Sequence, residues 1–195
     1  MKHSKVSLSL IFLGEIFPLS QGFIKYYKSK VSYANFKKGT VLVKQGGFSD
    51  KIYFIRQGLI RGFYQTINKE FTTWISMENE LVTSITGFFV EQPTRENIQV
   101  LEDTYVEYIS INDLNYLLEN FPEMSRIYLK LLTEYYMHSE SRALMARLPN
   151  AKLRYDFFIE AGLGHLVERV PHKYLASLLG IRPETFSRLL RDYSS

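Results

Sequence analysis

The sequence predicts an α+β protein with an N-terminal antiparallel β-roll or jelly roll flanked by helices, one long helix, and a C-terminal helix-turn-helix. Short β-type runs between residues 31 and 111 are separated by glycine turns at about ten-residue spacing, as in antiparallel sandwiches and rolls. The hydrophobic period then changes from about two to about 3.6 residues at Ile111, and a proline-started helical run follows from Pro122. Two short helical runs meet at Gly180 near the end of the chain.

The composition bounds the class of protein. The chain has 195 residues, of which 46% are hydrophobic, enough for a substantial core. It has no cysteine, which excludes disulfides, iron–sulfur ligation, thiolate zinc sites and cysteine nucleophiles. Lys2 and Lys5 precede the apolar run Val6–Leu13, a loose likeness to a signal peptide, but no small-residue cleavage site follows. No apolar run reaches the roughly 20 residues that span a bilayer, so we expect a cytoplasmic protein without a membrane segment.

Two helices are expected before the first strand. Ser20 is a suitable cap for a helix from Gln21 to about Lys30. The earlier helix is predicted to be short and amphipathic, with a face made of Leu8, Ile11, Phe12, Glu15 and Ile16.

The predicted strands follow one another from residue 31 to residue 111. Between the last two of them and the rest lies an irregular segment, residues 81–97, which we expect to be a long loop. Binding residues often sit on such loops. The strand-like runs are Val31–Phe36, Val41–Lys44, Ile52–Ile55, Leu59–Thr66, Phe71–Met77, Ile98–Leu101 and Tyr105–Ile111.

The helical part begins with a short helix that Asn112 or Asp113 is expected to cap. The following helix, from Pro122 to about Arg147, would be nearly 40 Å long at about 1.5 Å per residue, more than a small β domain needs for cover. Its apolar stripe either packs on the roll or forms a dimer seam, and the length favours the seam. The stripe consists of Met124, Ile127, Tyr128, Leu131, Leu132 and Tyr135.

The last segment has the pattern of a DNA-reading helix pair. Asn150 is expected to cap a helix over 151–161, and Gly180 is placed to end the next helix in a left-handed turn. Pro183 suits a first helical turn, and Phe186, Leu189 and Leu190 form an apolar back. A polar, basic front on such a helix suits DNA, although a plain helical hairpin with a solvated face would show the same pattern.

The charge of the chain is unevenly distributed. Residues 142–195 hold nine Lys/Arg and five Asp/Glu, a net charge of +4, whereas residues 1–141 hold 15 of each and are neutral. The excess therefore lies entirely in the segment with the helix pair, as expected if that segment meets phosphates.

The order of these parts resembles the Crp/Fnr transcription regulators, and the resemblance covers Phe36 to Arg191. The pieces that carry it are Lys38–Leu42, Asp50–Gly58, Leu101–Thr104, Leu175–Ile181 and Glu184–Arg188. Without a full phosphate cassette, the chain looks like the Bacteroidetes members. The resemblance implies a cyclic-nucleotide-binding-like sensory domain over 1–121, a long dimerisation helix and hinge over 122–148, and a helix-turn-helix DNA-binding domain over 149–195. It also implies a homodimer, a palindromic operator in double-stranded DNA, and RNA polymerase as a further candidate partner.

The resemblance assigns base reading to Glu184 and Arg188. The chemistry agrees, because Glu accepts from a cytosine amino group and Arg donates two bonds to guanine. Pro183 stands where many members have Arg. The chain ends four residues after Arg191, so we expect a winged-helix-like domain whose wing is reduced or absent. The full set of expected DNA-binding residues is Lys173, Arg182, Glu184, Thr185, Ser187, Arg188 and Arg191.

The expected effector pocket departs from the cyclic-AMP pattern of the family. Members that bind cyclic AMP have a Gly-Glu pair for the ribose and an Arg-Ser pair for the phosphate. This chain has Thr83-Ser84 and Thr94-Arg95 near those places, and a buried phosphate without a charged partner would be costly. We therefore expect no tight binding of cyclic AMP and no resident cofactor; the pocket either takes another ligand or is vestigial. The candidate residues are Thr83, Ser84, Thr94, Arg95, Asn97 and Tyr135.

Two other classes of function were weighed. A metal-dependent enzyme on a β-roll would need clustered ligands inside the roll, but all four histidines, His3, His138, His165 and His172, lie outside it. We therefore expect no catalytic residues, no metal site and no enzyme. The second alternative is a ligand-sensing or protein-interaction module that has lost sequence-specific DNA binding.

Overall fold

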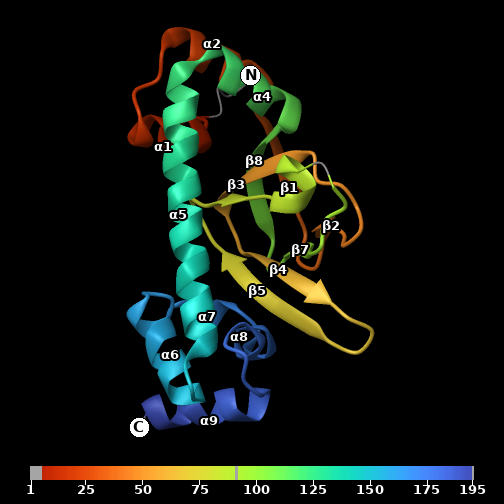
Figure 1. The fold of residues 1–195 in the computed structure, drawn as a ribbon, viewed down its shortest axis with the longest axis vertical. Helices are drawn as coiled ribbons and strands as arrows, with labels where there is room; N and C mark the ends of the chain where they lie inside the picture. Colours follow the sequence, from red (N-terminus) through yellow and green to blue (C-terminus); the bar gives the residue numbers. More distant parts are fainter. Residues whose placement is uncertain (1–5, 91, 195) are drawn as a thin grey trace. The chain divides into compact units, whose positions relative to one another are not determined.

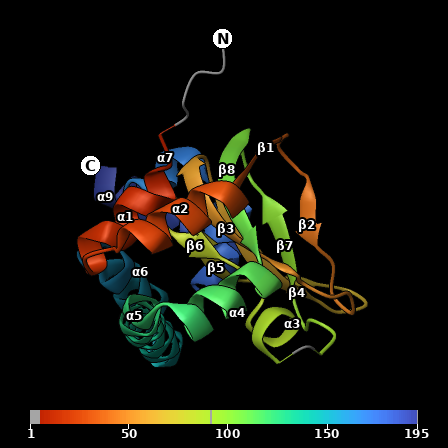
Figure 2. The ribbon, with the colours of Figure 1, turned by 90° about the horizontal axis from the view of Figure 1, so that it is seen from above.

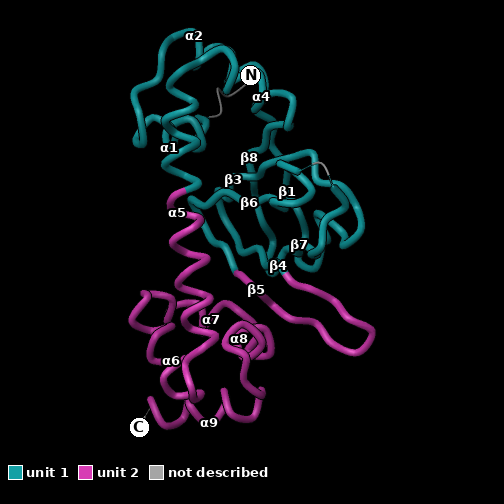
Figure 3. Tube along the Cα trace, in the orientation of Figure 1, with its two compact units in different colours: residues 1–62, 75–132 teal, residues 63–74, 133–195 magenta. Residues whose placement is uncertain are grey.

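The computed structural model describes residues 6–90 and 92–194, and its chain divides into two compact units (Figure 3). Unit 1 comprises residues 1–62 and 75–132, and unit 2 comprises residues 63–74 and 133–195. The division falls within the long helix rather than at its ends, and unit 2 also takes the tip of a β-hairpin. Lys2 and Lys5, which belong to the signal-peptide-like pattern, lie outside the described residues.

Two four-stranded sheets form the predicted roll (Figure 1). The first has the order β1-β8-β3-β6 and the second β2-β7-β4-β5. The pairs β1/β8, β3/β8, β3/β6 and β2/β7 are all antiparallel. This confirms the α+β class with an antiparallel roll. The strands are β1 (Ser32–Phe36), β2 (Val41–Val43), β3 (Lys51–Gln57), β4 (Ile60–Gln65), β5 (Glu70–Ser76), β6 (Leu81–Val82), β7 (Asn97–Val100) and β8 (Thr104–Ser110).

The turn between β3 and β4 depends on Gly58. Its φ is +115°, and a Cβ at this position would lie 2.2 Å from Oγ1 of Thr104. Its N–H donates to Oε1 of Glu78 at 2.7 Å. Only glycine fits both this backbone conformation and this close approach.

The helices α1 (Leu8–Ile16) and α2 (Gln21–Lys30) lie beside the first part of the long helix, as Figure 2 shows. Ser20 caps α2 by accepting from the N–H of Phe23 at 3.2 Å, as predicted. The predicted apolar face of α1 was wrong in part. Phe12 and Ile16 pack against the core as predicted, but the buried residues of this helix are Ser9, Leu10 and Leu13.

A buried carboxylate explains the orientation of α1. Glu107 of β8 is fully buried and accepts from the hydroxyl of Ser7 at 2.6 Å and from the N–H of Leu8 at 2.7 Å. Nη1 of Arg56 lies 3.3 Å from the same carboxylate. A negative charge at the first turn of a helix is stabilised by the N–H groups exposed there. Glu107 thereby fixes which side of α1 faces the roll.

The helix α4 (Ile111–Asn120) begins two or three residues earlier than predicted, because Ser110 caps it rather than Asn112 or Asp113. The hydroxyl of Ser110 accepts from the N–H of Asp113 at 3.1 Å. The long helix α5 runs from Pro122 to Arg147, as predicted. Its first part joins the main core of unit 1, whose buried members are Leu10, Leu13, Phe23, Tyr27, Phe88, Ile109, Leu114, Leu117, Met124, Ile127 and Leu131.

Unit 2 holds four helices after α5, one more than the sequence suggested. They are α6 (Ala151–Glu160), α7 (Leu166–Arg169), α8 (His172–Leu178) and α9 (Pro183–Ser194). Asn150 caps α6 as predicted, by accepting from the N–H of Leu153 at 2.9 Å. The tip of the β4–β5 hairpin belongs to this unit because Oγ of Ser177 accepts from the N–H of Thr72 at 2.9 Å.

Candidate nucleic-acid interface and ligand loop

The turn between α8 and α9 is a left-handed helix ending. Gly180 has φ of +63°. Its N–H donates to the carbonyl of Ser177 at 3.1 Å, and the N–H of Ile181 donates to the carbonyl of Ala176 at 2.9 Å. This pair of bonds is a Schellman motif, which satisfies the last carbonyls of α8 and redirects the chain into α9. The helix-turn-helix that Gly180 predicts is therefore present.

The back of α9 is buried in unit 2. Phe186 is fully buried, and its ring packs edge-on against Tyr155 of α6 at 5.9 Å and against His172 of α8 at 5.4 Å. Leu189 is buried on the same side, whereas Leu190 is only partly buried. Burial raises the pKa of the Tyr155 phenol, which keeps this ring neutral within the core.

The front of α9 is exposed. The term "α9 front" is used below for Arg182, just before the helix, and for Glu184, Thr185, Ser187, Arg188 and Arg191. All are exposed except Thr185, which is partly buried. Within residues 6–90 and 92–194, no ion pair or side-chain hydrogen bond engages the four charged members of this set.

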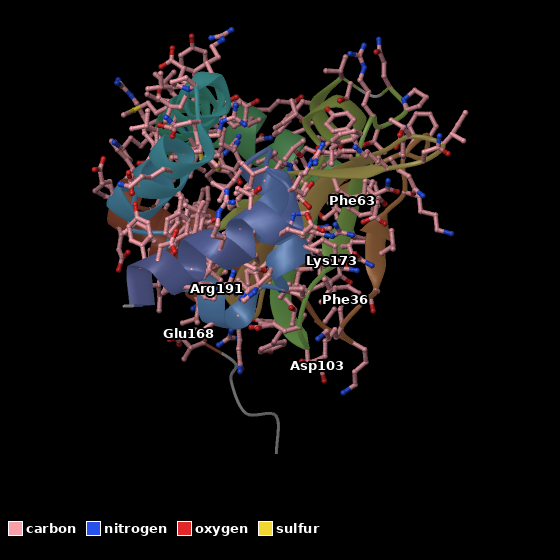
Figure 4. The ribbon with its side chains drawn as sticks, turned by 90° about the horizontal axis from the view of Figure 1, so that it is seen from below. Phe36, Phe63, Asp103, Glu168, Lys173 and Arg191 are labelled. Atoms are coloured by element: carbon pink, nitrogen blue, oxygen red, sulfur yellow. The ribbon has the colours of Figure 1, made fainter. Side chains whose placement is uncertain are left out.

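Lys173 adds a further exposed cation on α8, and its Nζ lies 4.8 Å from the centre of the Tyr174 ring. Figure 4 labels Lys173 on α8 and Arg191 on α9. The predicted DNA-binding residues are thus carried by two adjoining helices. The prediction requires side chains that are exposed on the helix pair, and these residues lie there. DNA contact itself stays a prediction.

Residues 81–97, called the ligand loop below, are not an irregular loop throughout. Strand β6 and the short helix α3 (Ile85–Phe89) occupy its first half. The sequence shows no capping box and no long apolar period there, so this helix was missed. It begins at Ser84, whose hydroxyl lies 3.4 Å from the N–H of Gly87.

Two hydroxyls of the ligand loop are hydrogen-bonded to each other. The hydroxyl of Ser84 lies 2.6 Å from that of Thr94, and both side chains are buried. Oγ1 of Thr94 also accepts from the N–H of Glu96 at 3.2 Å. The two side chains therefore satisfy each other and the local backbone.

The other predicted pocket residues lie at several separate places. Oγ1 of Thr83 donates to the carbonyl of Lys51 at 2.9 Å, and Oδ1 of Asn97 accepts from the N–H of Gln45 at 3.0 Å. Arg95 is exposed, and Tyr135 belongs to unit 2. Of the six candidates, Ser84 and Thr94 are joined by a hydrogen bond between their hydroxyls.

A buried cation in the roll was not foreseen. Arg61 of β4 is 1% exposed, and its Nε and Nη2 donate to Oε1 of Gln99 at 3.0 and 2.8 Å. Gln99 in turn donates to the carbonyl of Gly39 at 3.1 Å. A lone Arg in the apolar run from Ile60 to Phe63 was the available signal, since a buried Arg needs hydrogen-bond partners.

The predicted dimer seam on α5 needs correction at three positions. Met124, Ile127 and Leu131 lie in the core of their own unit, where α1, α2 and α4 cover them, and are not left for a partner. Tyr128 packs against that core. The stripe had the right helical period, but a neighbouring part of the same chain buries it. Leu132 and Tyr135 are 40% and 39% exposed, and for these two the seam stays a prediction.

No helix among the described residues is both long and apolar enough to cross a membrane. No group of three or more metal-ligating His, Asp or Glu side chains comes together in that part of the chain.

Comparison with known proteins agrees with this architecture. Residues 33–121 match the family described as the cyclic nucleotide-binding domain. A transcriptional regulator of the Crp/Fnr family from Eubacterium rectale has a TM-score of 0.71 at 15% identity, over 92% of this chain and 88% of that one. The chain has the Crp/Fnr fold.

Two further solved structures show the same likeness. FixK2 from Bradyrhizobium japonicum has a TM-score of 0.70 at 14% identity, over 83% of each chain. CLP from Xanthomonas campestris, a c-di-GMP responsive global regulator, has a TM-score of 0.66 at 16% identity, over 90% of this chain and 92% of that one. No curated protein sequence matches the chain.

Proposed function

We propose that this chain is a sequence-specific DNA-binding transcription regulator of the Crp/Fnr type that acts as a homodimer. The observation that carries the proposal is the α9 front, an exposed basic surface whose apolar back is buried. Its charged side chains are not committed to bonds within the described residues, so they are available to an outside partner. The Crp/Fnr fold supplies the setting in which such a helix enters a major groove.

Glu184 and Arg188 are proposed to read bases. They are separated by one helical turn, and no ion pair between them appears among those described. Each therefore keeps its hydrogen-bonding capacity for a base edge. Lys173 and Arg191, farther along the same surface, suit phosphates, which position the helix without reading sequence.

The proposed dimer interface is the exposed face of α5. Exposed apolar side chains recur on this helix at Leu129, Leu132 and Tyr136, three and four residues apart, and continue to Leu144. This spacing places them on one helix face, opposite the face that unit 1 buries. An exposed apolar stripe of this kind is typical of a two-helix seam.

Any effector is proposed to differ from cyclic AMP. The Ser84–Thr94 pair supports this, because it offers neither the charge nor the free acceptors that a cyclic phosphate and ribose require. CLP, which shares the fold, responds to c-di-GMP, so the fold accommodates other ligands.

The decisive experiment is selection of bound sequences from random duplex DNA with the full chain at moderate salt. We expect a two-fold symmetric motif with half-sites about one helical turn apart. On this motif, Arg188→Ala should lose roughly tenfold to a hundredfold in affinity, because it removes a bidentate base contact. The matched control Arg95→Ala, an exposed arginine of the ligand loop, should bind as the unaltered protein does. Recovery of no motif, with or without cell extract added to supply an effector, would favour a sensing or interaction module that has lost DNA binding.

A further inference from the structure

Helix α6 contacts both the turn that precedes α9 and the last turn of α9, and Arg154 makes the contacts with the preceding turn. Nε of Arg154 donates to the carbonyl of Leu148 at 2.9 Å. Its Nη1 donates to the carbonyls of Leu179 and Gly180 at 3.2 and 3.1 Å. One guanidinium therefore links Leu148, the residue just after α5, to the turn that precedes α9.

The contacts of Arg154 fall on backbone groups that helix endings leave without helical partners. Leu148 follows the last residue of α5, while Leu179 and Gly180 form the left-handed ending of α8. The Schellman bonds use the carbonyls of Ala176 and Ser177, and the later carbonyls of Leu179 and Gly180 accept from Arg154 instead. A planar fork of five donors can bridge such separate acceptors, whereas the single ammonium of a lysine cannot hold the same geometry.

The far end of α9 is held from the same helix. The hydroxyl of Tyr193 donates to Asp156 of α6, and Nζ of Lys152 lies 3.3 Å from the second oxygen of that carboxylate. The rings of Tyr193 and Tyr155 are in edge contact at 4.9 Å. Helix α6 thus contacts the last turn of α9 through Asp156 and the turn before α9 through Arg154.

From these contacts we propose that Arg154 is a positioning residue for DNA reading, which fixes the direction of α9 relative to the end of α5. It makes no contribution to the exposed α9 front, since its donors point to carbonyls behind it. The base-reading role of α9 is taken from the proposed function. The positioning itself, however, can be measured without DNA.

The first test measures the position of α9 directly. Because the chain has no cysteine, spin labels can be placed at Ala146→Cys, near the end of α5, and Ser187→Cys, on α9, both of which are exposed. Labelled chains are diluted with unlabelled ones so that distances within one chain dominate. We expect a narrow distance distribution that becomes broad in Arg154→Lys. Arg147→Lys is the matched control, because Arg147 is exposed. If the guanidinium of Arg154 is what positions α9, the distance distribution of this control stays narrow.

The second test measures binding to the selected motif and to a scrambled duplex. Arg154→Lys keeps the charge, so affinity for the scrambled duplex and its salt dependence should be unchanged. Affinity for the motif should fall by roughly tenfold or more, since base contacts require the correct helix direction. A purely structural role would lower both affinities in proportion to the unfolded fraction, seen as lost helical circular dichroism. That result, or an unchanged distance distribution, overturns the inference. Failure of the unaltered protein to select any motif would count against the proposed function, while the distance measurement still decides the role of Arg154.

Discussion

The ligand loop and the α9 front are the two predicted binding regions, and both carry polar side chains, but the polar groups are engaged in opposite ways. In the ligand loop, Ser84 and Thr94 are buried and bonded to each other. On the α9 front, Arg182, Glu184 and Arg188 are exposed and, within the described residues, not engaged in any ion pair or side-chain hydrogen bond. A buried polar group must find its partner inside the chain, whereas an exposed one keeps its capacity for an outside molecule.

This difference distinguishes the proposed DNA-binding surface from the proposed effector site. The α9 front keeps its charged side chains exposed, while two hydroxyls in the ligand loop are hydrogen-bonded to each other. The same principle accounts for Glu107, whose buried carboxylate is used up by the first turn of α1 and by Arg56. Internal satisfaction of these polar groups therefore indicates a structural role, whereas the exposed charges of the α9 front keep their hydrogen-bonding capacity for an outside molecule.

The largest expected effect concerns the roll that carries the ligand loop. Gly58→Ala should lower the free energy of unfolding by about 3–5 kcal/mol, because it combines backbone strain with a clash against Thr104. Gly39→Ala is the matched control, since φ there is +88° but nothing lies within 4 Å of the added Cβ. It should cost only about 1 kcal/mol. Urea denaturation followed by circular dichroism compares the two, and equal losses would contradict the close approach at Gly58.

A second prediction concerns the two faces of α5. Leu132→Glu places a charge on the outward apolar stripe and should weaken self-association by about 2 kcal/mol or more. Ile127→Ala instead removes a fully buried side chain from the core of unit 1, so it should reduce stability without a specific effect on association of the folded chain. Sedimentation equilibrium over a range of concentrations measures the first, and thermal unfolding the second. Unchanged association of Leu132→Glu would show that this face is not the seam.

The smallest expected effect concerns the hydroxyl pair. Ser84→Ala should cost about 1–2 kcal/mol, because it leaves the hydroxyl of Thr94 with one partner fewer and removes the cap of α3. Thr94→Val should cost a similar amount. The double variant should lose less than the sum of the two, since neither hydroxyl then remains buried without the other. Strict additivity in this double-mutant cycle would mean that the two side chains do not interact.

Much of the architecture could be predicted from local patterns. Gly180 and Pro183 mark the turn and the start of α9, and Ser20 and Asn150 cap their helices, because these residues act on the backbone beside them. The strand-rich region and the bounds of α5 also follow from periodicity. The exposed front and buried back of α9 are a consequence of its helical repeat.

The remaining features were decided by contacts between residues far apart in the chain. Periodicity finds the stripe of Met124, Ile127 and Leu131 but does not say whether a second copy or the chain's own α1, α2 and α4 cover it. Likewise, Glu107 meets Ser7 across 100 positions, and Arg154 meets Gly180 across 26. The sequence alone determined the main strands, the long helix, their order and the basic helix pair, since these depend on neighbours along the chain, but it did not show the short helices α3 and α7. Which polar groups are consumed inside the fold was set by the tertiary structure, because hydrogen-bond partners are chosen by proximity in space.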